Sequence, residues 1–332
     1  MSNLQKFLFE GRPVRGAIVR LDDVWIEIQQ RRAASGAFAP VVNELLGEMS
    51  AAALLLQASI KFNGAVVLQI QGDGPLKLAV AEAQPDWGVR CTATLTGGPS
   101  EGAAWNDWVN ATGKGICALT LDPKDRLPGQ TPYQGLVPMV DEHGAPLKNF
   151  SQAISTYMKQ SEQLDTLMLL AANEQCAFGL MLQHMPATGE HNLAATSATR
   201  ADSDGMGAND AFEHLAMLAM SLQREEMLQL DTDTLLRRLF WQEPLVRLPA
   251  IDAGLALQPH FACRCSRERV SGMLVNLGAE EVQSVVAEQG HVNVTCEFCG
   301  QPYVFDAVDA AALFQPNLTP HISSGGKPQQ LH

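Results

Sequence analysis

The sequence predicts an α+β protein with an N-terminal, mainly antiparallel sheet with packed helices, a helical linker and a small C-terminal domain. In residues 1–185, helix-periodic stretches occur beside strands that alternate apolar and polar residues. Residues 186–250 lose this alternation and later carry apolar residues at helical spacing. Residues 251–310 contain four of the seven cysteines, in two tight pairs. Helices that follow consecutive strands argue against a doubly wound parallel sheet.

In the N-terminal domain, Pro40 suits the first turn of a helix that continues with an apolar face to Ala53. The strands expected next are Val66–Ile70, Leu76–Val80, Val89–Leu95 and Ile116–Leu121. The first two flank a Gly-Asp-Gly-Pro turn and should form a hairpin. Ser151 is expected to cap another helix. Two apolar runs close the domain, 167–172 and 176–182.

The linker, residues 186–250, should begin with a flexible stretch. Pro186 to Asp210 is rich in Ala, Thr, Ser, Gly and Asp and has almost no large apolar residue. A helix with an apolar face from Phe212 to Leu222 follows, and then a second short helix that Asp231 or Thr232 caps. Several methionines accompany the first helix. They indicate either ordinary docking onto the first domain or an adaptable binding surface.

In the C-terminal domain, residues 251–310, Ser266 should start a helix that Gly278 ends, and Gly290 should stop a second helix. Two alternating strands then surround a turn at Cys299-Gly300. This arrangement puts one cysteine pair at a helix start and the other on a hairpin. Residues 311–332 contain Ser-Ser-Gly-Gly and prolines, and they are expected to be a disordered tail.

The cysteine spacing predicts a zinc site. Cys263 and Cys265 form a C-x-C pair, and Cys296 and Cys299 form a C-x-x-C pair. Four thiolates can close a tetrahedron around one Zn²⁺. Such a shell leaves no open position for a substrate or an activated water, so the zinc should be structural and no catalytic residue is expected. The three single cysteines fall on apolar positions of strands and are expected to be buried small hydrophobes: Cys91, Cys117 and Cys176.

The charge balance excludes several function classes. The chain has 23 basic and 36 acidic residues, a net charge of −13. Residues 251–310 contain three arginines and eight acidic residues, so this domain should repel phosphate rather than bind nucleic acid. No apolar N-terminal core resembles a signal peptide, and no stretch is long enough to span a bilayer. We expect a cytoplasmic protein without a membrane partner.

The motifs of the cysteine domain resemble those of the heat shock protein 33 family, the bacterial redox-regulated chaperones. The resemblance rests on Cys263–Arg269, Glu280–Val282 and Cys296–Gly300, and upstream on Gly11–Gly16, Tyr133–Pro138 and Ser161–Leu164. It implies an ATP-independent holdase and not an enzyme, inactive when reduced and zinc-bound and active when oxidised. It also implies unfolding client proteins as partners and a homodimer on activation.

Oxidation is expected to form Cys263–Cys265 and Cys296–Cys299. Once the metal is lost and the segment unfolds, closing a short loop costs less chain entropy than closing a long one. The family resemblance implies the same pairing. Two other hypotheses stay open on the sequence alone. One is a thiol-disulfide oxidoreductase that uses the C-x-x-C pair, and the other is a zinc-stapled scaffold that binds partners in either redox state.

Overall fold

The computed structural model describes residues 1–33, 36–98, 103–125, 129, 131–141, 143–185, 208–249, 251–252, 255–256 and 258–315. The chain forms two compact units. The larger unit comprises Met1–Cys263 and Glu297–Gly300, and the smaller one comprises Arg264–Cys296 and Gln301–His332. Most of the predicted flexible stretch, 186–207, and the predicted tail beyond 315 lie outside the described residues. The bounds of the four segments expected from the sequence stay predictions.

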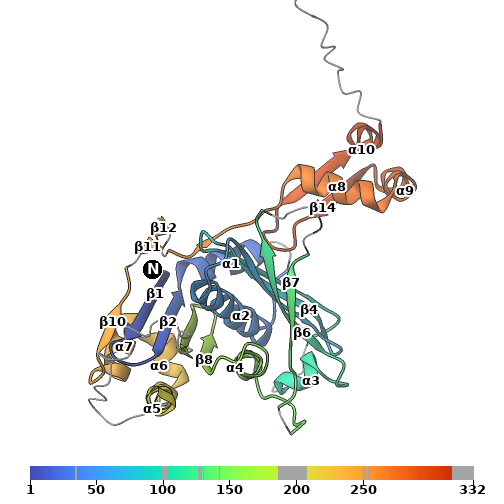
Figure 1. Cartoon of the computed structure of the whole chain (residues 1–332). Coiled ribbons are helices and arrows are strands. Elements are labelled where there is room, and N and C mark those ends of the chain that lie inside the picture. Colours follow the sequence, from blue (N-terminus) through green and yellow to red (C-terminus); the bar gives the residue numbers. More distant parts are fainter. Residues whose placement is uncertain are drawn as a thin grey trace, which may run out of the picture. The chain divides into compact units, whose positions relative to one another are not determined.

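The larger unit contains a five-stranded antiparallel sheet with the order β10-β1-β2-β9-β8 (Figure 1). Its strands are β1 (Asn3–Phe9), β2 (Val14–Leu21), β8 (Thr166–Ala172), β9 (Ala177–His184) and β10 (Leu245–Arg247). The strand β9 pairs with β2 along its whole length, from Val14↔His184 to Leu21↔Ala177. The N-terminal hairpin is thus held by a hairpin from the other end of the first domain.

A second sheet of six strands has the order β13-β5-β4-β3-β6-β7. Its strands are β3 (Gly64–Gln71), β4 (Leu76–Ala83), β5 (Gly88–Leu95), β6 (Ile116–Pro123), β7 (Tyr133–Val137) and β13 (His260–Phe261). All neighbours are antiparallel except β13, which lies parallel to β5. Two short strands form a separate pair, β11 (Ile251–Asp252) and β12 (Leu255–Ala256).

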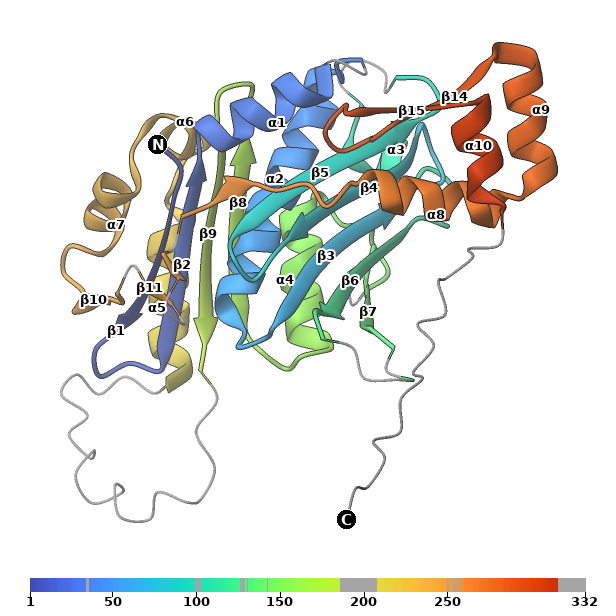
Figure 2. The same cartoon turned by 90° about the horizontal axis from the view of Figure 1, so that it is seen from above.

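The helix α2 (Pro40–Ser59) lies between the two sheets and forms the centre of the larger core (Figure 2). Pro40 occupies its first turn, as predicted. Nearly every residue from Leu45 to Ala58 is buried, because both sheets pack on the helix and a buried helix can be apolar all round. Gly47 marks the closest approach, since a Cβ there would lie 2.5 Å from the Cβ of Ala172.

Three further helices complete this part of the unit: α1 (Asp23–Ala33), α3 (Trp105–Val109) and α4 (Phe150–Gln160). The predicted cap of α4 is wrong. Asn149 is the cap, and its side-chain oxygen accepts from the amide of Gln152 at 2.9 Å. The Ser151 hydroxyl instead donates to the carbonyl of Met168 in β8. Asn caps a helix as well as Ser does, so the bond of Ser151 to β8 leaves the capping position to Asn149 without a loss of stability.

The linker helices cover the second face of the five-stranded sheet. They are α5 (Ala208–Met220), α6 (Arg224–Gln229) and α7 (Thr232–Phe240). Asp231 caps α7 by accepting from the amide of Thr234 at 2.8 Å, as expected. Phe240 packs edge-on against Phe9 of β1, with ring centroids 5.1 Å apart. Other buried members of this second core are Phe7, Val14, Ile18, Phe178, Leu180, Leu182, Leu215, Ala219, Leu222, Leu235, Leu236 and Leu239.

The methionines contribute less to this docking than the sequence suggested. Met217 and Met220 remain 62% and 58% exposed, and only Met227 is buried. The buried residues of α5 are alanine and leucine, and Phe212 and Leu218 pack beside them as partly buried residues. Docking onto the first domain is therefore confirmed for these helices, with Leu215 rather than the methionines at its centre.

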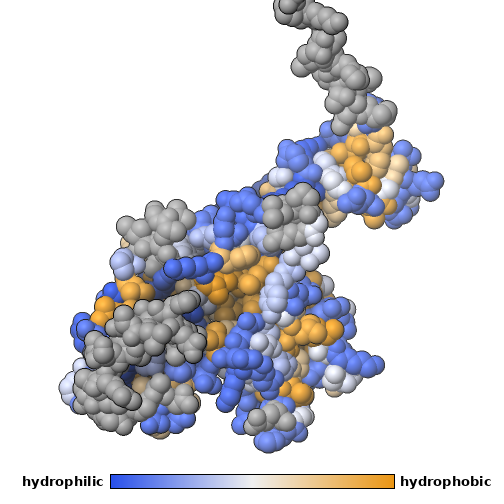
Figure 3. Space-filling view, viewed as in Figure 1, coloured by the Kyte–Doolittle hydropathy of each residue, from blue (hydrophilic) through white to orange (hydrophobic). Residues whose placement is uncertain are grey.

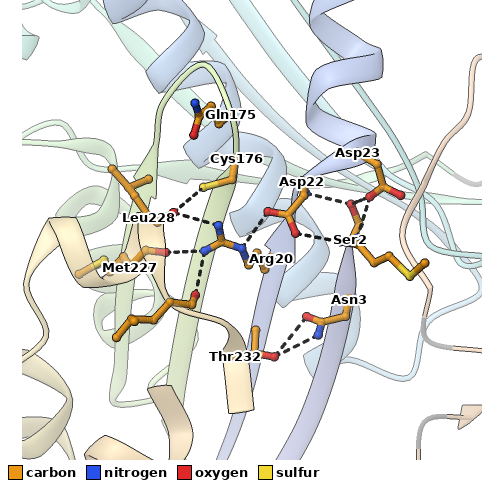
Figure 4. A network of polar contacts seen from close by, with 12 residues as sticks. Ser2, Asn3, Arg20, Asp22, Asp23, Gln175, Cys176, Met227, Leu228 and Thr232 are labelled. Atoms are coloured by element: carbon orange, nitrogen blue, oxygen red, sulfur yellow. Dashed lines mark hydrogen bonds and ion pairs between the residues drawn. The ribbon is translucent and has the colours of Figure 1, made fainter. Parts of the chain in front are cut away.

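A polar network holds α6 against β2 (Figure 4). The guanidinium of Arg20 donates to the carbonyls of Met227, Leu228 and Leu230 at 2.9–3.1 Å, which satisfies the carbonyls that a helix C-terminus leaves without partners. Asp22 pairs with the same guanidinium at 2.8 Å. At the other end of the helix, Arg224 donates to the carbonyl of Ala172 at 2.7 Å. Two arginines thus anchor both ends of one short helix.

The smaller unit is built as the sequence predicts, from α8 (Arg267–Leu277), α9 (Ala279–Gln289) and the hairpin of β14 (His291–Thr295) and β15 (Pro302–Asp306). Ser266 caps α8, and Gly278 and Gly290 end the helices with φ of 105° and 78°. A further helix, α10 (Ala307–Leu313), crosses the predicted start of the tail. The core of this unit has five buried residues: Leu274, Val282, Val292, Phe305 and Ala310.

The α+β class with mainly antiparallel strands is confirmed, but the single expected sheet is two sheets. No strand was predicted before residue 66, so β1 and β2 were missing from the prediction, and with β2 the second partner of β9. Within the described residues, none of the helices combines the length and the apolar character that a bilayer crossing requires.

Candidate metal centre

The first cysteine pair follows the strand β13. His260 and Phe261 pair with Gly88 and Val89 of β5, and the amide of Ala262 donates to the carbonyl of Val89 at 3.2 Å. These bonds fix the chain just before Cys263. Cys265 stands immediately before Ser266, the cap of α8.

The second pair lies in the turn between β14 and β15. The amide of Cys296 donates to the carbonyl of Gln301 at 2.9 Å, which closes the turn around residues 297–300. Gly300 has φ of 70°, a left-handed conformation that glycine adopts without steric cost. The turn therefore holds Cys296 and Cys299 close together, as the C-x-x-C spacing predicted.

The four sulfur atoms of Cys263, Cys265, Cys296 and Cys299 all lie within 4.8 Å of one another. All four residues are half-buried. Four Sγ atoms at this separation could hold a metal ion. The cysteines that the sequence pairs in two groups are therefore brought together at one place.

Arg90 of β5 contacts both arms of this site within the larger unit. Its guanidinium lies 3.8 Å from the sulfur of Cys263 and 4.2 Å from the ring centroid of Phe298. Glu82 on the neighbouring strand holds Arg90 in place, with 2.9 Å between Nε and the carboxylate. The hydroxyl of Thr92 donates to the carbonyl of Glu297 at 2.9 Å. Arg90 and Thr92, which share one face of β5, thus contact Phe298 and its neighbour Glu297.

The other predicted positions behave as expected. Cys91, Cys117 and Cys176 are 2%, 1% and 1% exposed, and they are not part of the four-sulfur cluster. Burial raises the pKa of Cys91 and of Cys117 to about 12, so both thiols stay protonated and unreactive. The prediction of buried, small apolar side chains is confirmed.

The family model described as Hsp33 protein matches residues 2–306. The chain belongs to the Hsp33 family. A 33 kDa chaperonin of Chromobacterium violaceum is 39% identical over 311 residues, 94% of this chain and 93% of its own length. A 33 kDa chaperonin of Methylobacillus flagellatus is 40% identical over 318 residues, 95% of either chain. Membership of this chaperone family supports a chaperone function.

The fold has a counterpart of known structure. The crystal structure of a 33 kDa chaperonin, a heat shock protein 33 homologue from Thermotoga maritima, matches with a TM-score of 0.68. The match covers 94% of this chain and 97% of the other, at 19% sequence identity. The family resemblance that the cysteine motifs suggested is confirmed.

The donor set of this Hsp33 chain suits a soft, tetrahedral ion. Four thiolates match Zn²⁺, whose bonds to sulfur are about 2.3 Å long in structural sites. When bound, such an ion supplies folding free energy and keeps the sulfurs deprotonated. The chain's own elements position the four cysteines. Cys263 follows β13, and Cys265 stands just before α8. Cys296 follows β14, and Cys299 lies in the turn at 297–300.

Sequence reasoning missed Arg90, Thr92 and Glu82. A charged residue inside a strand reads as an ordinary solvent-facing position, and nothing in the local pattern links β5 to a cysteine motif far along the chain. The signal that could have found them is the pair Glu82 and Arg90, opposite charges on adjacent strands flanked by buried residues.

Arg90 should position the metal site. We expect Arg90→Ala to weaken metal affinity about 10- to 100-fold, the usual cost of removing a group that orients metal ligands. Because Arg90→Ala also leaves the buried carboxylate of Glu82 without its partner, Phe298→Ala serves as a second variant that keeps this ion pair. Competition with a chromogenic zinc chelator measures the affinity of both variants. Unchanged affinity in both would contradict the positioning role.

Proposed function

We propose that this protein is a redox-regulated, ATP-independent holdase. In the reduced form one Zn²⁺ is bound by Cys263, Cys265, Cys296 and Cys299, and the protein is inactive. Oxidation releases the ion, unfolds the smaller unit and loosens the linker, so that the protein binds unfolding clients. The observation that carries this proposal is that four sulfurs within 4.8 Å of one another flank a unit with only five buried core residues.

A unit with such a core depends on its metal. Domains of this size bury too little apolar surface for much stability on their own. A structural zinc contributes an apparent free energy of folding of about 10–16 kcal/mol in small zinc domains at pH 7. Removing the ion therefore removes most of what holds the smaller unit folded.

The oxidation step needs only a peroxide. One thiolate attacks the peroxide and becomes a sulfenic acid, with hydroxide as the leaving group, and the neighbouring thiol displaces the second oxygen as water. Each disulfide forms by loss of two electrons, which reduce one peroxide molecule to water. Two disulfides consume all four ligands of the zinc, so the ion has no remaining partner.

Release of the linker helices would expose the surface that clients would use. The helices cover a sheet face that carries Phe7, Phe9, Val14 and Ile18 together with three apolar residues of β9. Exposed apolar patches of this kind bind other apolar surfaces without nucleotide. The strand β13, which leads into Cys263, and the linker helices belong to the same continuous segment of the larger unit. Release of Cys263 together with β13 would remove the attachment at the end of this segment. Among the described strands, β10, which pairs with β1, would then be its remaining contact with either sheet after α7.

The partners we propose are unfolding proteins. Residues 251–310 carry a net charge of −5 before the thiolates are counted, which disfavours nucleic acid. A homodimer on activation, a cytoplasmic location and the absence of membrane binding remain predictions from the sequence, as does the absence of enzymatic activity.

The deciding experiment measures zinc content, free thiols and suppression of client aggregation in one sample, before and after peroxide with mild heating. We expect one zinc per chain and no suppression before oxidation, and zinc loss with suppression afterwards, without ATP. A Cys263→Ser/Cys296→Ser variant should hold no stoichiometric zinc. Equal suppression in both states would favour a constitutive scaffold, and turnover of a dithiol substrate would favour an oxidoreductase.

The disulfides should form within the pairs, Cys263–Cys265 and Cys296–Cys299. In the folded site all four sulfurs are near one another, so the folded geometry does not favour one disulfide pairing over another. The pairing is therefore determined in the unfolded segment. There a partner two or three positions away has an advantage of about 2 kcal/mol in loop closure over one thirty residues away. Peptide mapping without reductant measures the pairing. A dominant Cys265–Cys296 crosslink would contradict both the pairing and the unfolding step.

Loosening of the linker should activate the protein without oxidation. Leu218 of α5 packs against the second core, the one between the linker helices and the five-stranded sheet. Leu218→Glu places a charge there at a cost of several kcal/mol. We expect this variant to show partial holdase activity in the reduced, zinc-bound form. Met217→Glu on the exposed face of the same helix is the matched control and should stay inactive. Hydrogen exchange of residues 208–240 that does not change on oxidation would count against linker release.

A further inference from the structure

Three motifs of the sequence have no part in the metal centre, yet they converge at one place. The segments Gly11–Gly16, Tyr133–Pro138 and Ser161–Leu164 contribute Arg15, Tyr133 and Glu162 to the lining of one cavity at the C-terminal end of α2. On the face shown in Figure 3, apolar side chains gather in a hollow in the middle of the larger unit, between the two sheets. The chain thus brings charged and aromatic residues from three distant segments to one apolar hollow.

Two cavities adjoin here, since both are lined by Arg15, Ser59 and Ile60. The first has a volume of about 100 Å³ and lies against the six-stranded sheet. Its apolar lining includes Leu56, Val66, Leu119, Leu121 and Met158. The second has a volume of about 220 Å³ and lies against the five-stranded sheet. Its apolar lining includes Phe7, Ala58, Met181 and Leu248.

Arg15 is the charged group that the two cavities share. Its Nε donates to the side-chain oxygen of Gln183 at 3.0 Å, and the Gln183 amide donates in turn to the hydroxyl of Thr166 at 3.1 Å. Gln183 is fully buried, so it fixes the guanidinium in one position. Among the residues that the structure describes, Gln183 is the only hydrogen-bond partner of Arg15, and no carboxylate pairs with it. Burial also lowers the pKa of Arg15.

Glu162 lines the same cavity as Arg15, but no ion pair or hydrogen bond joins these two described residues. Its carboxylate accepts from the hydroxyl of Tyr157 at 2.6 Å and from that of Tyr133 at 3.2 Å. Gln163 beside it adopts a positive φ of 56°, a conformation that costs a residue with a Cβ about 1 kcal/mol or more. The carboxylate therefore holds the hydroxyl of Tyr133, which lines the first cavity, and that of Tyr157 beside it.

A second positive charge stands at the other cavity. Lys61 lines it from the end of α2 and is exposed, and no ion pair or hydrogen bond joins its amine to a described residue. Lys6 also lines the second cavity, but it already has an interaction partner. The chain as a whole carries a charge of −13, so three cations around one apolar hollow, Arg15, Lys61 and Lys6, run against its general character. A guanidinium held half-buried without a counter-ion is costly, and an anionic ligand would remove this cost.

We propose that these cavities bind a small monocarboxylate with an apolar body, whose carboxylate pairs with Arg15 and Lys61. The apolar lining excludes a strongly hydrated dianion such as phosphate, since its second charge would face hydrocarbon. A dry cavity of about 150 Å³ accommodates benzene, so the larger of these two suits a body of about six carbons. The carboxylate gives orientation, and the hydrocarbon part displaces water from the cavity.

A purely structural role for the two cations is the competing explanation. The last four carbonyls of α2 lack partners within the helix, and cations near a helix C-terminus are stabilising. In that case Arg15 and Lys61 would contribute to stability and bind nothing. Both explanations are consistent with the positions of Arg15 and Lys61. They differ in whether the cavities bind a carboxylate ligand.

The test titrates the full-length, reduced, zinc-loaded protein with hexanoate and follows binding by NMR chemical shifts of the protein methyl groups. Hexanol and hexylamine, which have the same body without the negative charge, are the ligand controls. Titration extends to about 20 mM, because a ligand of about eight non-hydrogen atoms has a limited affinity. We expect saturable shifts of residues at the end of α2 with hexanoate, and weaker binding of both controls by at least about tenfold.

Two variants locate the charge. Arg15→Gln should weaken hexanoate binding about 10- to 100-fold, and the exposed Lys61→Gln should weaken it a few-fold without a change in melting temperature. Arg31→Gln removes an exposed arginine elsewhere and should leave binding unchanged. If wild-type protein shows no saturable shifts, or binds hexanol as tightly as hexanoate, the proposal is wrong. Equal hexanoate affinity in the wild type and in both single variants would also overturn the proposal.

Discussion

The five-stranded sheet of this protein is apolar on both faces, and each face must be covered. On one face the side chains of Leu4, Val19 and Leu21 belong to the core around α2, while on the other Phe7, Phe9 and Ile18 belong to the core under the linker helices. Residues adjacent in β1 and β2 thus contribute to two separate cores, because successive side chains of a strand point to opposite faces. The helix α2 covers one face and the linker helices cover the other.

The two coverings differ in how firmly they are held. The helix α2 is enclosed by both sheets, and moving it would expose the largest core of the protein. The linker helices keep a solvated face, which is polar apart from residues such as Met217 and Met220, so moving them exposes only the core beneath them. Their polar attachments lie mainly at α6, where Arg20 and Arg224 bond to backbone carbonyls. The proposed switch requires a covering of this kind, whose release would leave the core around α2 intact.

Local sequence signals identified most of the elements but not their partners. Pro40, Asp231, Ser266 and Gly290 mark helix ends through backbone chemistry that acts within a few residues, and all four were predicted. The cysteine cluster was predicted for a similar reason, since ligand spacing is a local property.

What could not be predicted depends on contacts between distant segments. The pairing of β2 with β9 makes two sheets out of one, Ser151 gives up its cap for a bond to Met168, and Arg90 lies beside Cys263 only because β13 adds to the edge of β5. Each of these requires the fold to be known first. Hydrophobic periodicity alone does not contain that information.

The smaller unit and the proposed disulfides fit together energetically. A structural zinc contributes about 10–16 kcal/mol to a small domain. On the chain-entropy estimate, a disulfide that closes a loop of three or four residues contributes only about 2 kcal/mol, and one that joins the two pairs across some thirty residues contributes about 4 kcal/mol. Local disulfides therefore replace the metal with the weakest crosslinks that four cysteines can make. Among the described residues, the smaller unit has a core of five buried side chains, which cannot offset that difference. If oxidation acts as proposed, disulfides within the two close pairs would thus leave the smaller unit unfolded, whereas long-range disulfides would staple it again.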